Sequence, residues 1–387
     1  MDSERRLRIL FAIPAHWPAV AFGGPIPVAR ELGGALGRLG HSITAVTTTL
    51  LDLERRPSAR TSTGVVDGVQ IIYLATPFHY RWMGVTPTLP LWLRRWRPRP
   101  EIVHLFGYRD VVTTVTAAWA AWAGIPYVLE PLGMYLPRFR SLGKKRVFDA
   151  AIGRRLAARA TRVIATSELE RRELAGAGLD PKRIAVRPNG FPAVTRNGAR
   201  EGLRNRLHLA RDEPLLLYVG RISYKKGLDL LVEALADLPD AHLAVVGPDD
   251  RDGTLETLRS ITARRGLESR VHLLGPLGPD GLGSIYADAD VFVLPSRNEN
   301  FGNVAAEAAA AGTPVVLTDR CGVAELLQDR AALVVRCAVP AIRDALGRLL
   351  DDPELRRKLG RGGVEVAREV SWPQVARLQE QLYLELV

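Results

Sequence analysis

Cysteine is scarce in this chain of 387 residues, where only Cys321 and Cys337 occur. Two cysteines without metal-ligand spacing and without a second pair exclude a disulfide-rich secreted domain and a cysteine-based zinc fold. We expect both thiols to be reduced and structural, which suits a cytoplasmic protein.

Long apolar runs are also missing. No stretch approaches the roughly eighteen apolar residues that a membrane-spanning helix needs. Near the N-terminus, Arg5, Arg6 and Arg8 precede an apolar run as in a signal peptide, but Pro14 and Pro18 interrupt that run. We therefore expect a first buried strand there.

A Gly-x-Gly-x-x-Gly sequence, the mark of dinucleotide binding, does not follow this first expected strand. A nicotinamide-dependent oxidoreductase would show a similar alternation of strands and helices and stays open as a rival. Failure to bind NAD(P) in a simple titration would exclude it.

What the chain does have is a regular alternation of strands and helices in both halves. A strand over 7–14, a loop with Gly23 and Gly24, a helix over 26–39 and a strand from His41 form a βαβ unit. A diglycine lets a phosphate or sugar approach the backbone closely, although a plain tight turn explains it equally well. The second half restarts the alternation. We therefore predict an α/β fold of two doubly wound domains.

Other elements can be placed by residue number. Residues 64–74 indicate a hairpin that turns at Asp67-Gly68. A short strand should end at His104, and a strand-end histidine is more often structural than functional. The second-half strands are expected at 214–219, 242–246, 270–274, 291–294 and 332–335, and the helices at 226–238, 254–265, 280–287, 339–350 and 353–368.

Charge is unevenly divided. Residues 1–200 carry 30 lysines and arginines against 14 acidic residues, whereas residues 201–387 carry 23 against 28. A strongly basic region of a protein typically binds an anionic partner, such as nucleic acid, lipid headgroups or an acidic substrate. Because no recognised nucleic-acid-binding module accompanies the charge, we expect no nucleic acid. An anionic membrane surface or an anionic acceptor fits better.

Two stretches concentrate this charge. Residues 87–99 interleave tryptophan and leucine with arginine, which suits a headgroup interface but also a tryptophan core with solvated arginines. Residues 138–162 hold nine basic side chains on expected helices and their approaches. We expect this second stretch to face a membrane or an anionic acceptor, against the alternative of a merely solvated face.

The most informative stretch lies between two short β-branched runs, residues 291–294 and 314–317. Glu299 stands in the polar loop between them and Glu307 on the alanine-rich helix that follows, with seven residues between the two. Such a loop presents N–H groups and the positive end of a helix dipole to phosphate-bearing ligands. A half-buried Glu307 needs a partner, either a sugar hydroxyl or, in the plainer account, an arginine.

The segment PSRNENFGNVAAEAAAAGTPVV, residues 295–316, resembles the signature of the family 4 retaining glycosyltransferases (glycosyl transferases group 1). The resemblance extends over nearly the whole chain. It implies the glycosyltransferase-B fold, with two Rossmann-like domains facing across a cleft. It also implies a hexosyltransferase that moves a sugar from a nucleotide diphosphate sugar, of the UDP or GDP type, to an acceptor hydroxyl with retention. Cell-envelope polysaccharide or glycolipid biosynthesis is the expected setting.

The resemblance also assigns roles to residues. Arg221 and Lys226 match the family's Gly-Arg and Lys-Gly pattern and would hold the diphosphate and stabilise the charge that develops as it leaves. Glu299 would contact the donor sugar, and Glu307 the ribose hydroxyls. The other expected donor-binding residues are Gly23 and Gly24, from the diglycine loop, and Asn300, Phe301, Gly302, Asn303 and Val304, at the start of the alanine-rich helix.

Two local features bear on the chemistry. Asp288-Ala-Asp290 looks like a metal-binding motif of the other major glycosyltransferase fold, but it stands where the family carries an acidic dipeptide structurally. We predict no catalytic metal and no cofactor besides the donor. Many family members carry a histidine where this chain has Leu132, so we expect a different contact to the donor sugar or acceptor.

We predict an N-terminal acceptor-side domain over residues 1–195, with the amphipathic segment 371–387 packing back on it. A C-terminal nucleotide-sugar-binding domain would cover residues 196–370. The acceptor should be a sugar or lipid-linked, and the protein cytoplasmic, peripheral on the inner face of the membrane. A catalytically silent nucleotide-sugar-binding protein of the same fold stays open because of Leu132.

Overall fold

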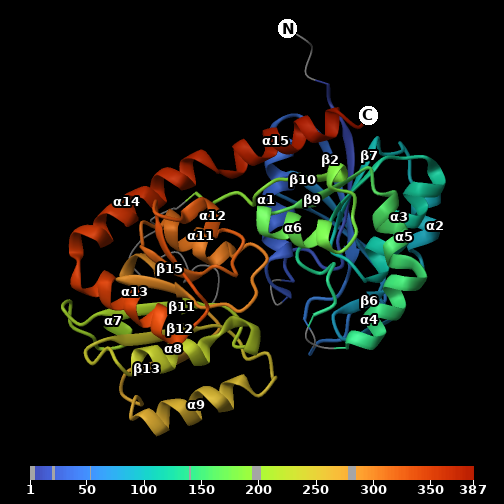
Figure 1. Ribbon diagram of the computed structural model, residues 1–387. Coiled ribbons are helices and arrows are strands. Elements are labelled where there is room, and N and C mark those ends of the chain that lie inside the picture. Colours follow the sequence, from blue (N-terminus) through green and yellow to red (C-terminus); the bar gives the residue numbers. More distant parts are fainter. Residues whose placement is uncertain (1–4, 20–21, 53, 139–140, 194–201, 278–284) are drawn as a thin grey trace. The chain divides into compact units, whose positions relative to one another are not determined.

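The computed structural model describes residues 5–19, 22–52, 54–138, 141–193, 202–277 and 285–387. The chain divides into two compact units, the first made of Met1–Gly190 and Trp372–Val387 and the second of Phe191–Ser371 (Figure 1). The predicted boundary between residues 195 and 196 lies outside the described residues, as does most of the helix predicted over 280–287.

The first unit is built on an eight-stranded sheet in the order β10-β9-β8-β7-β1-β2-β4-β3. Neighbouring strands are parallel except β3 and β4, which form the predicted hairpin with Val66 opposite Val69. The strands are β1 (Arg8–Ala12), β2 (Ser42–Thr48), β3 (Ser62–Val66), β4 (Val69–Leu74), β7 (Ile102–Phe106), β8 (Tyr127–Glu130), β9 (Arg162–Ala165) and β10 (Ile184–Val186), with a separate hairpin of β5 (Phe78–Tyr80) and β6 (Met83–Val85).

Helices connect these strands as parallel neighbours require. Side chains cap the starts of α3 and α6: Asp110 accepts from the Thr113 amide at the start of α3, and Ser167 from the Glu170 amide at the start of α6. The helices are α1 (Pro25–Arg38), α2 (Leu89–Arg95), α3 (Val111–Ala123), α4 (Leu142–Phe148), η2 (Asp149–Gly153), α5 (Arg154–Arg159), α6 (Glu168–Gly176), η3 (Pro181–Arg183) and α15 (Trp372–Leu384).

A fully buried polar cluster ties α15 to the first sheet. Arg187 forms an ion pair with Glu130, at the end of β8. The two ring nitrogens of His104 lie 3.1 Å from the Glu130 carboxylate and 2.5 Å from the hydroxyl of Tyr383, on α15. Burial alone would raise the pKa of Glu130, but the charge of Arg187 and the hydrogen bond with His104 lower it overall.

The prediction that a strand ends at His104 is wrong. Strand β7 continues to Phe106, and His104 lies within it with no exposed surface. The ring stacks on Phe106 at 4.2 Å between centroids, and burial lowers its pKa. Its role is to fill and bond the core, which agrees with the structural alternative.

The second unit holds a six-stranded sheet, parallel throughout, in the order β13-β12-β11-β14-β15-β16. Strand order reverses between β11 and β14, which creates the switch point where α/β folds bind ligands. The strands are β11 (Leu215–Val219), β12 (His242–Val246), β13 (Val271–Gly275), β14 (Val291–Leu294), β15 (Val315–Thr318) and β16 (Ala332–Val335). The two predicted doubly wound α/β domains are thus confirmed.

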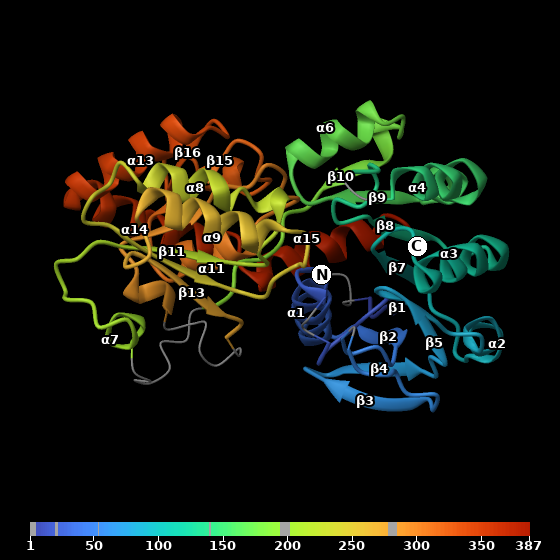
Figure 2. The same cartoon turned by 90° about the horizontal axis from the view of Figure 1, so that it is seen from below.

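The helices of this unit include the alanine-rich one of the sequence analysis. They are α7 (Leu203–Arg206), η4 (Tyr224–Lys226), α8 (Leu228–Leu235), α9 (Thr254–Arg265), α11 (Asn303–Ala310), α12 (Ala324–Leu327), α13 (Val339–Asp351) and α14 (Pro353–Glu369). Helices α11 and α14 pack closely (Figure 2). A Cβ on Gly363 would overlap the Ala309 carbonyl, so small residues are needed on both helices. Among the described residues, no helix has both the length and the apolar character to cross a membrane.

Replacing Arg187 with methionine should cost the protein about 3–5 kcal/mol of unfolding free energy, because the Glu130 carboxylate would stay buried without its cation. Urea unfolding followed by circular dichroism measures this. Arg171→Met is the matched control, since Arg171 pairs with Glu168 at the surface and its loss should change stability by less than about 1 kcal/mol. Equal stability of the two variants would contradict a structural role for the buried cluster.

Candidate functional site

The predicted catalytic side chains gather at one edge of the second sheet. Arg221 and Lys226 follow β11, and Glu299 follows β14. Strands β11 and β14 are parallel neighbours, so their carboxyl ends meet at the same edge. Helix α11 begins four residues after Glu299 and brings its N-terminus to this edge as well.

Lys226 and Glu299 form an ion pair, and their side chains are only 12% and 15% exposed. From the sequence we predicted separate roles for the two residues, binding the diphosphate for Lys226 and contacting the sugar for Glu299. Burial pushes the pKa of Glu299 up, but the charges of Lys226, Lys225 and Arg221 outweigh burial and lower it overall. Glu299 is therefore an anion at neutral pH, ready to face positive charge.

The turn η4, which carries Lys226, is fixed to the Glu299 loop by Arg297. Its guanidinium forms a double hydrogen bond with Asp229, at 2.7 and 2.6 Å, and donates to the Tyr224 carbonyl at 2.9 Å. It also lies 4.4 Å from the centre of the Tyr224 ring. Arg297 was not predicted from the sequence, although its place two residues before Glu299 was a signal. This clamp sets the distance between the two loops.

Arg221 is more exposed than Lys226. Its side chain is 43% exposed, and its guanidinium lies 3.1 Å from the Asp250 carboxylate. The backbone around it is held firmly, because its carbonyl accepts a hydrogen bond from the hydroxyl of the buried Tyr218 at 2.8 Å. Such a partly exposed arginine can turn to a ligand at small cost, since surface ion pairs contribute little.

The start of α11 supplies backbone donors next to Glu299. The Ala305 and Ala306 amides both donate to the Gly302 carbonyl, at 2.9 and 3.2 Å, so the hydrogen bonds of the helix itself begin at the third residue of α11. Gly302 has φ +104°, where a Cβ would lie 3.2 Å from Leu294 and 3.3 Å from Val323. Phe301 is buried in the core and contributes backbone only. Asn303 and Val304 complete the first turn.

Glu307 finds a partner that the sequence analysis did not anticipate. The hydroxyl of Tyr286 donates to its carboxylate at 2.6 Å, in place of the arginine of the plainer account. Burial raises the pKa of Glu307, and the bond from Tyr286 opposes this rise. Tyr286 was missed because no spacing rule links a tyrosine before β14 to a glutamate on α11. Asn300, the remaining predicted donor residue, stands directly after Glu299.

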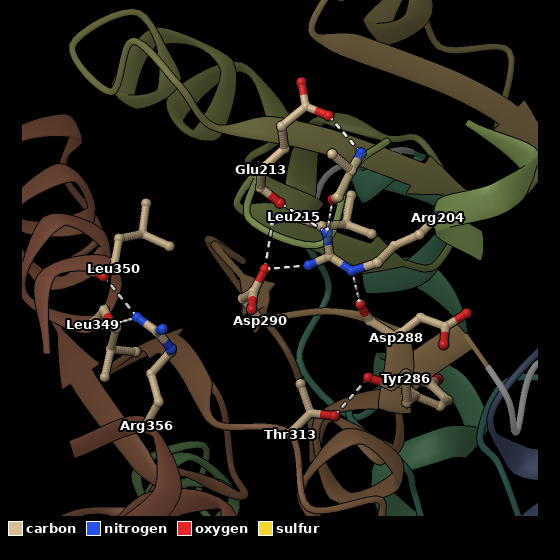
Figure 3. A network of polar contacts seen from close by, with 11 residues as sticks. Arg204, Glu213, Leu215, Tyr286, Asp288, Asp290, Thr313, Leu349, Leu350 and Arg356 are labelled. Carbon is tan, nitrogen blue, oxygen red and sulfur yellow. Dashed lines mark hydrogen bonds and ion pairs between the residues drawn. The ribbon is translucent and has the colours of Figure 1, made fainter. Parts of the chain in front are cut away.

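The Asp288-Ala-Asp290 pair is bound by protein groups (Figure 3). Arg204 forms an ion pair with Asp290 at 2.5 Å and donates to the Asp288 carbonyl at 3.0 Å. The Asp290 carboxylate also accepts from the Leu215 amide at 2.8 Å, and the Asp288 carboxylate from the Leu203 amide at 2.5 Å. Among the described residues, no group of three or more potential acidic, histidine or cysteine ligands forms a metal cluster. The acidic pair thus fastens α7 to the sheet.

The diglycine belongs to the first unit. Gly23 has φ +82°, and no atom of the described residues lies within 4 Å of a Cβ placed on it, so a ligand can approach its backbone. Gly24 is the N-cap of α1. These two residues thus belong to a different unit from Arg221, Lys226 and Glu299, which are in the second unit.

Leu132 adopts a left-handed backbone conformation, with φ +52°, in the loop after β8. The next residue, Gly133, donates its amide to the carboxylate of Glu170 at 2.8 Å, and the Thr166 amide donates to the same carboxylate at 2.8 Å. Burial raises the pKa of Glu170 to about 7 despite these bonds. A left-handed leucine costs on the order of 1 kcal/mol, so the surrounding bonds impose this conformation.

Comparison with known proteins adds the family. Residues 23–190 match the model described as glycosyl transferase 4-like domain, and residues 199–366 match glycosyl transferases group 1. The two matches follow one another along most of both units. The chain therefore belongs to the family 4 glycosyltransferases, which have the GT-B fold.

Curated relatives and solved structures agree with this. The chain is 36% identical over 219 residues to the D-inositol 3-phosphate glycosyltransferase of Corynebacterium efficiens, covering 53% of this chain and 52% of that protein. It is 35% identical over 297 residues to the enzyme of that name from Nocardia farcinica, covering 74% and 61%. The chain thus spans about half to three fifths of the length of these relatives.

Two solved structures resemble the chain over nearly its full length. Sucrose-phosphate synthase from Thermosynechococcus elongatus has a TM-score of 0.76 at 25% identity, covering 99% of each chain. Anabaena HepE in complex with UDP-glucose has a TM-score of 0.77 at 18% identity, covering 99% of this chain and 100% of that one. The second likeness, at such low identity, concerns the fold.

Replacing Gly302 with alanine should destabilise the protein by about 1–3 kcal/mol, because the positive φ and two close neighbours both oppose a Cβ. Gly143→Ala, on α4, is the matched control: within the described part of the chain, nothing lies within 4 Å of its Cβ position, and helix propensity should make the change stabilising by up to about 1 kcal/mol. Thermal unfolding of both variants measures the contrast. Equal melting temperatures would contradict the assigned strain.

Proposed function

We propose that this protein transfers a sugar, with retention, from a nucleotide diphosphate sugar to an acceptor hydroxyl. The observation that carries the proposal is the buried pair of Lys226 and Glu299, set between Arg221 and the N-terminus of α11. A cation, an anion and helix-end amides at one sheet edge suit a substrate with a negative diphosphate and a sugar that becomes positive. Relatives named as glycosyltransferases support the same reaction.

In this proposal the residues divide the work. Arg221, Lys226 and the first amides of α11 hold the diphosphate and stabilise its charge as the glycosidic bond breaks. Glu299, anionic because cations surround it, steadies the positive charge near the anomeric carbon. Glu307 exchanges the hydroxyl of Tyr286 for ribose hydroxyls, or accepts from both.

We propose that no metal takes part in this step. Positive charge at the diphosphate comes from side chains and helix-end amides, while Asp288 and Asp290 are already bound by Arg204 and by backbone amides. A carboxylate pair that fastens a helix to a sheet is not a vacant ligand set. Unchanged transfer in the presence of EDTA supports this point, and loss of transfer that Mg²⁺ or Mn²⁺ restores opposes it.

For the donor we propose a UDP or GDP sugar, and for the acceptor a sugar or a lipid-linked sugar of the cell envelope that carries negative charge. The solved HepE structures hold UDP, UDP-glucose and glucose, and the names of the curated relatives include D-inositol 3-phosphate, a phosphorylated compound. The excess of basic residues in the first half favours an anionic acceptor on that side.

A catalytically silent nucleotide-sugar-binding protein is the second candidate, because Leu132 stands where many relatives carry a histidine. A panel of UDP, GDP and ADP sugars separates the two. Slow release of free nucleoside diphosphate from one of these sugars identifies an enzyme. Binding of a nucleotide sugar without release, with or without envelope acceptors, identifies the silent protein.

Replacing Lys226 with alanine should lower the rate of nucleoside diphosphate release by on the order of a hundredfold or more, because a charge that stabilises the leaving group is lost. Glu299→Gln should lower it by a similar factor. Lys358→Ala removes an exposed lysine on α14 and should leave the rate unchanged. Both site variants must remain folded by circular dichroism, and near wild-type release by Lys226→Ala would contradict its role.

We further propose that α4 and η2 rest on an anionic membrane. No residue of α4 is buried, Val147 is 70% exposed and Ile152 is 45% exposed. Lys144 and Arg146 stand among these apolar side chains. Apolar groups interleaved with cations suit the headgroup region of an anionic bilayer.

Replacing Val147 with aspartate should weaken binding to vesicles containing phosphatidylglycerol by about fivefold or more, since one added negative charge near the surface costs on the order of 1 kcal/mol. Vesicle sedimentation measures this. Val65→Asp is the matched control, because Val65 is equally exposed, at 73%, on the edge strand β3. Binding that is equal for both variants, or absent from the wild type, would contradict the surface assigned here.

A further inference from the structure

Three cations stand at the candidate diphosphate site, and the structure divides them unequally. Lys226 is bound to Glu299, and Arg221 lies against Asp250. The third, Lys225, precedes Lys226 on η4 and is half-buried. Within the part of the chain that the structure describes, its ammonium group has no hydrogen bond and no ion pair. It is the cation of the site without a partner.

The backbone of Lys225 is held in place while its side chain is not. Its carbonyl accepts from the Arg297 amide at 2.8 Å and from the Asn298 amide at 3.4 Å, which joins η4 to the Glu299 loop. On the other side, the Tyr224 amide donates to the carboxylate of Asp252 at 3.1 Å. These bonds fix the origin of the Lys225 side chain at the sheet edge. A positioned but unpaired ammonium group is suited to an incoming anion.

Four charged side chains near Lys225 shift the pKa of its ammonium group. Burial, Lys226 and Arg221 lower its pKa to about 8, against the opposing effect of Glu299 and Asp250. The unpartnered ammonium is thus held less favourably than one in water. A ligand with two or more negative charges relieves this, and it does so without separating Lys226 from Glu299.

We propose that Lys225 is a further diphosphate-binding residue of this site and meets the donor while Lys226 stays bound to Glu299. This inference rests on the proposed function, since it assumes that a nucleoside diphosphate binds here. It assigns the first contact to a residue outside the Gly-Arg and Lys-Gly pattern. Lys226 then keeps Glu299 anionic and in place for the sugar, while its charge still contributes to holding the diphosphate.

The consequence is a proton taken up on binding. Near pH 8 about half of the Lys225 amines are neutral in the free protein, and a diphosphate favours the charged form, so binding should take up as much as about half a proton. The terminal phosphate of UDP, with a pKa of about 6, is already ionised at this pH. Affinity should therefore fall as the pH rises from 7 to 9.5.

Calorimetric titration of the full chain with UDP, GDP and ADP at pH 8, in buffers of different ionisation enthalpy, measures this proton uptake. The nucleotide that binds most tightly is then compared with its monophosphate. Lys225→Met should weaken binding of the diphosphate by about 10- to 100-fold, the loss expected for a charge-assisted bond, and binding of the monophosphate less. Lys225→Arg should keep most of the affinity and abolish the proton uptake, because arginine stays charged.

Lys358→Met controls for the loss of one positive charge and should match the wild type. Diphosphate affinity that is unchanged in Lys225→Met, or proton uptake that persists in Lys225→Arg, would overturn the inference and leave the proposed function standing. If the wild type binds none of the three diphosphates, the proposed function falls and this inference with it. The arginine variant separates a binding role from a structural one, because a purely structural lysine would not take up a proton when the diphosphate binds.

Discussion

The ion pair of Lys226 and Glu299 is the interaction on which the candidate site depends. Two charges at 12% and 15% exposure cost several kcal/mol each to remove from water, and their mutual attraction offsets this only in good geometry. A hydrophobic pair of the same size would serve stability as well or better. The pair is therefore more readily explained by a charged ligand than by folding. The clamp of Arg297 on Asp229 and Tyr224 gives the pair its geometry.

Both units place polar groups at the carboxyl ends of parallel strands, but they use them differently. In the second unit, charges follow β11 and β14 and stay within reach of solvent. In the first, Glu130 ends β8 and is sealed by Arg187 and His104 with no exposed surface. Glu130 therefore anchors the start of the loop that carries Leu132. The same edge of the fold thus carries partly exposed charges in the second unit and a buried anchor in the first.

The sequence predicted most of the fold because its strands are short, apolar and buried on both faces. Strands β12 and β14 and helix α9 have the predicted bounds, since Gly247, Pro295 and Gly266 directly follow them, and β16 has them because the charged Arg336 ends its apolar run. The sequence also predicted that Arg221, Lys226 and Glu299 lie at one sheet edge, because the carboxyl ends of neighbouring parallel strands share an edge. It could not predict the partners. The bonds of Glu307 to Tyr286 and of Lys226 to Glu299 join positions 21 and 73 residues apart, and no local periodicity encodes such pairs.

Net charge in the first half overstates the charge that is available to a partner. Arg109 donates to the Asp149 carboxylate and to the carbonyls of Met134 and Tyr135, and Arg183 donates to the Ala158 carbonyl. These arginines order loops, because a guanidinium can satisfy several carbonyl groups at once. On α4, Lys145 is also bound to a carbonyl, that of Arg138, but Lys144 and Arg146 are exposed, and apolar side chains are exposed beside them. The position of a charge relative to carbonyl groups and apolar surface, more than its sign, therefore decides which part of this basic half can meet an anionic partner.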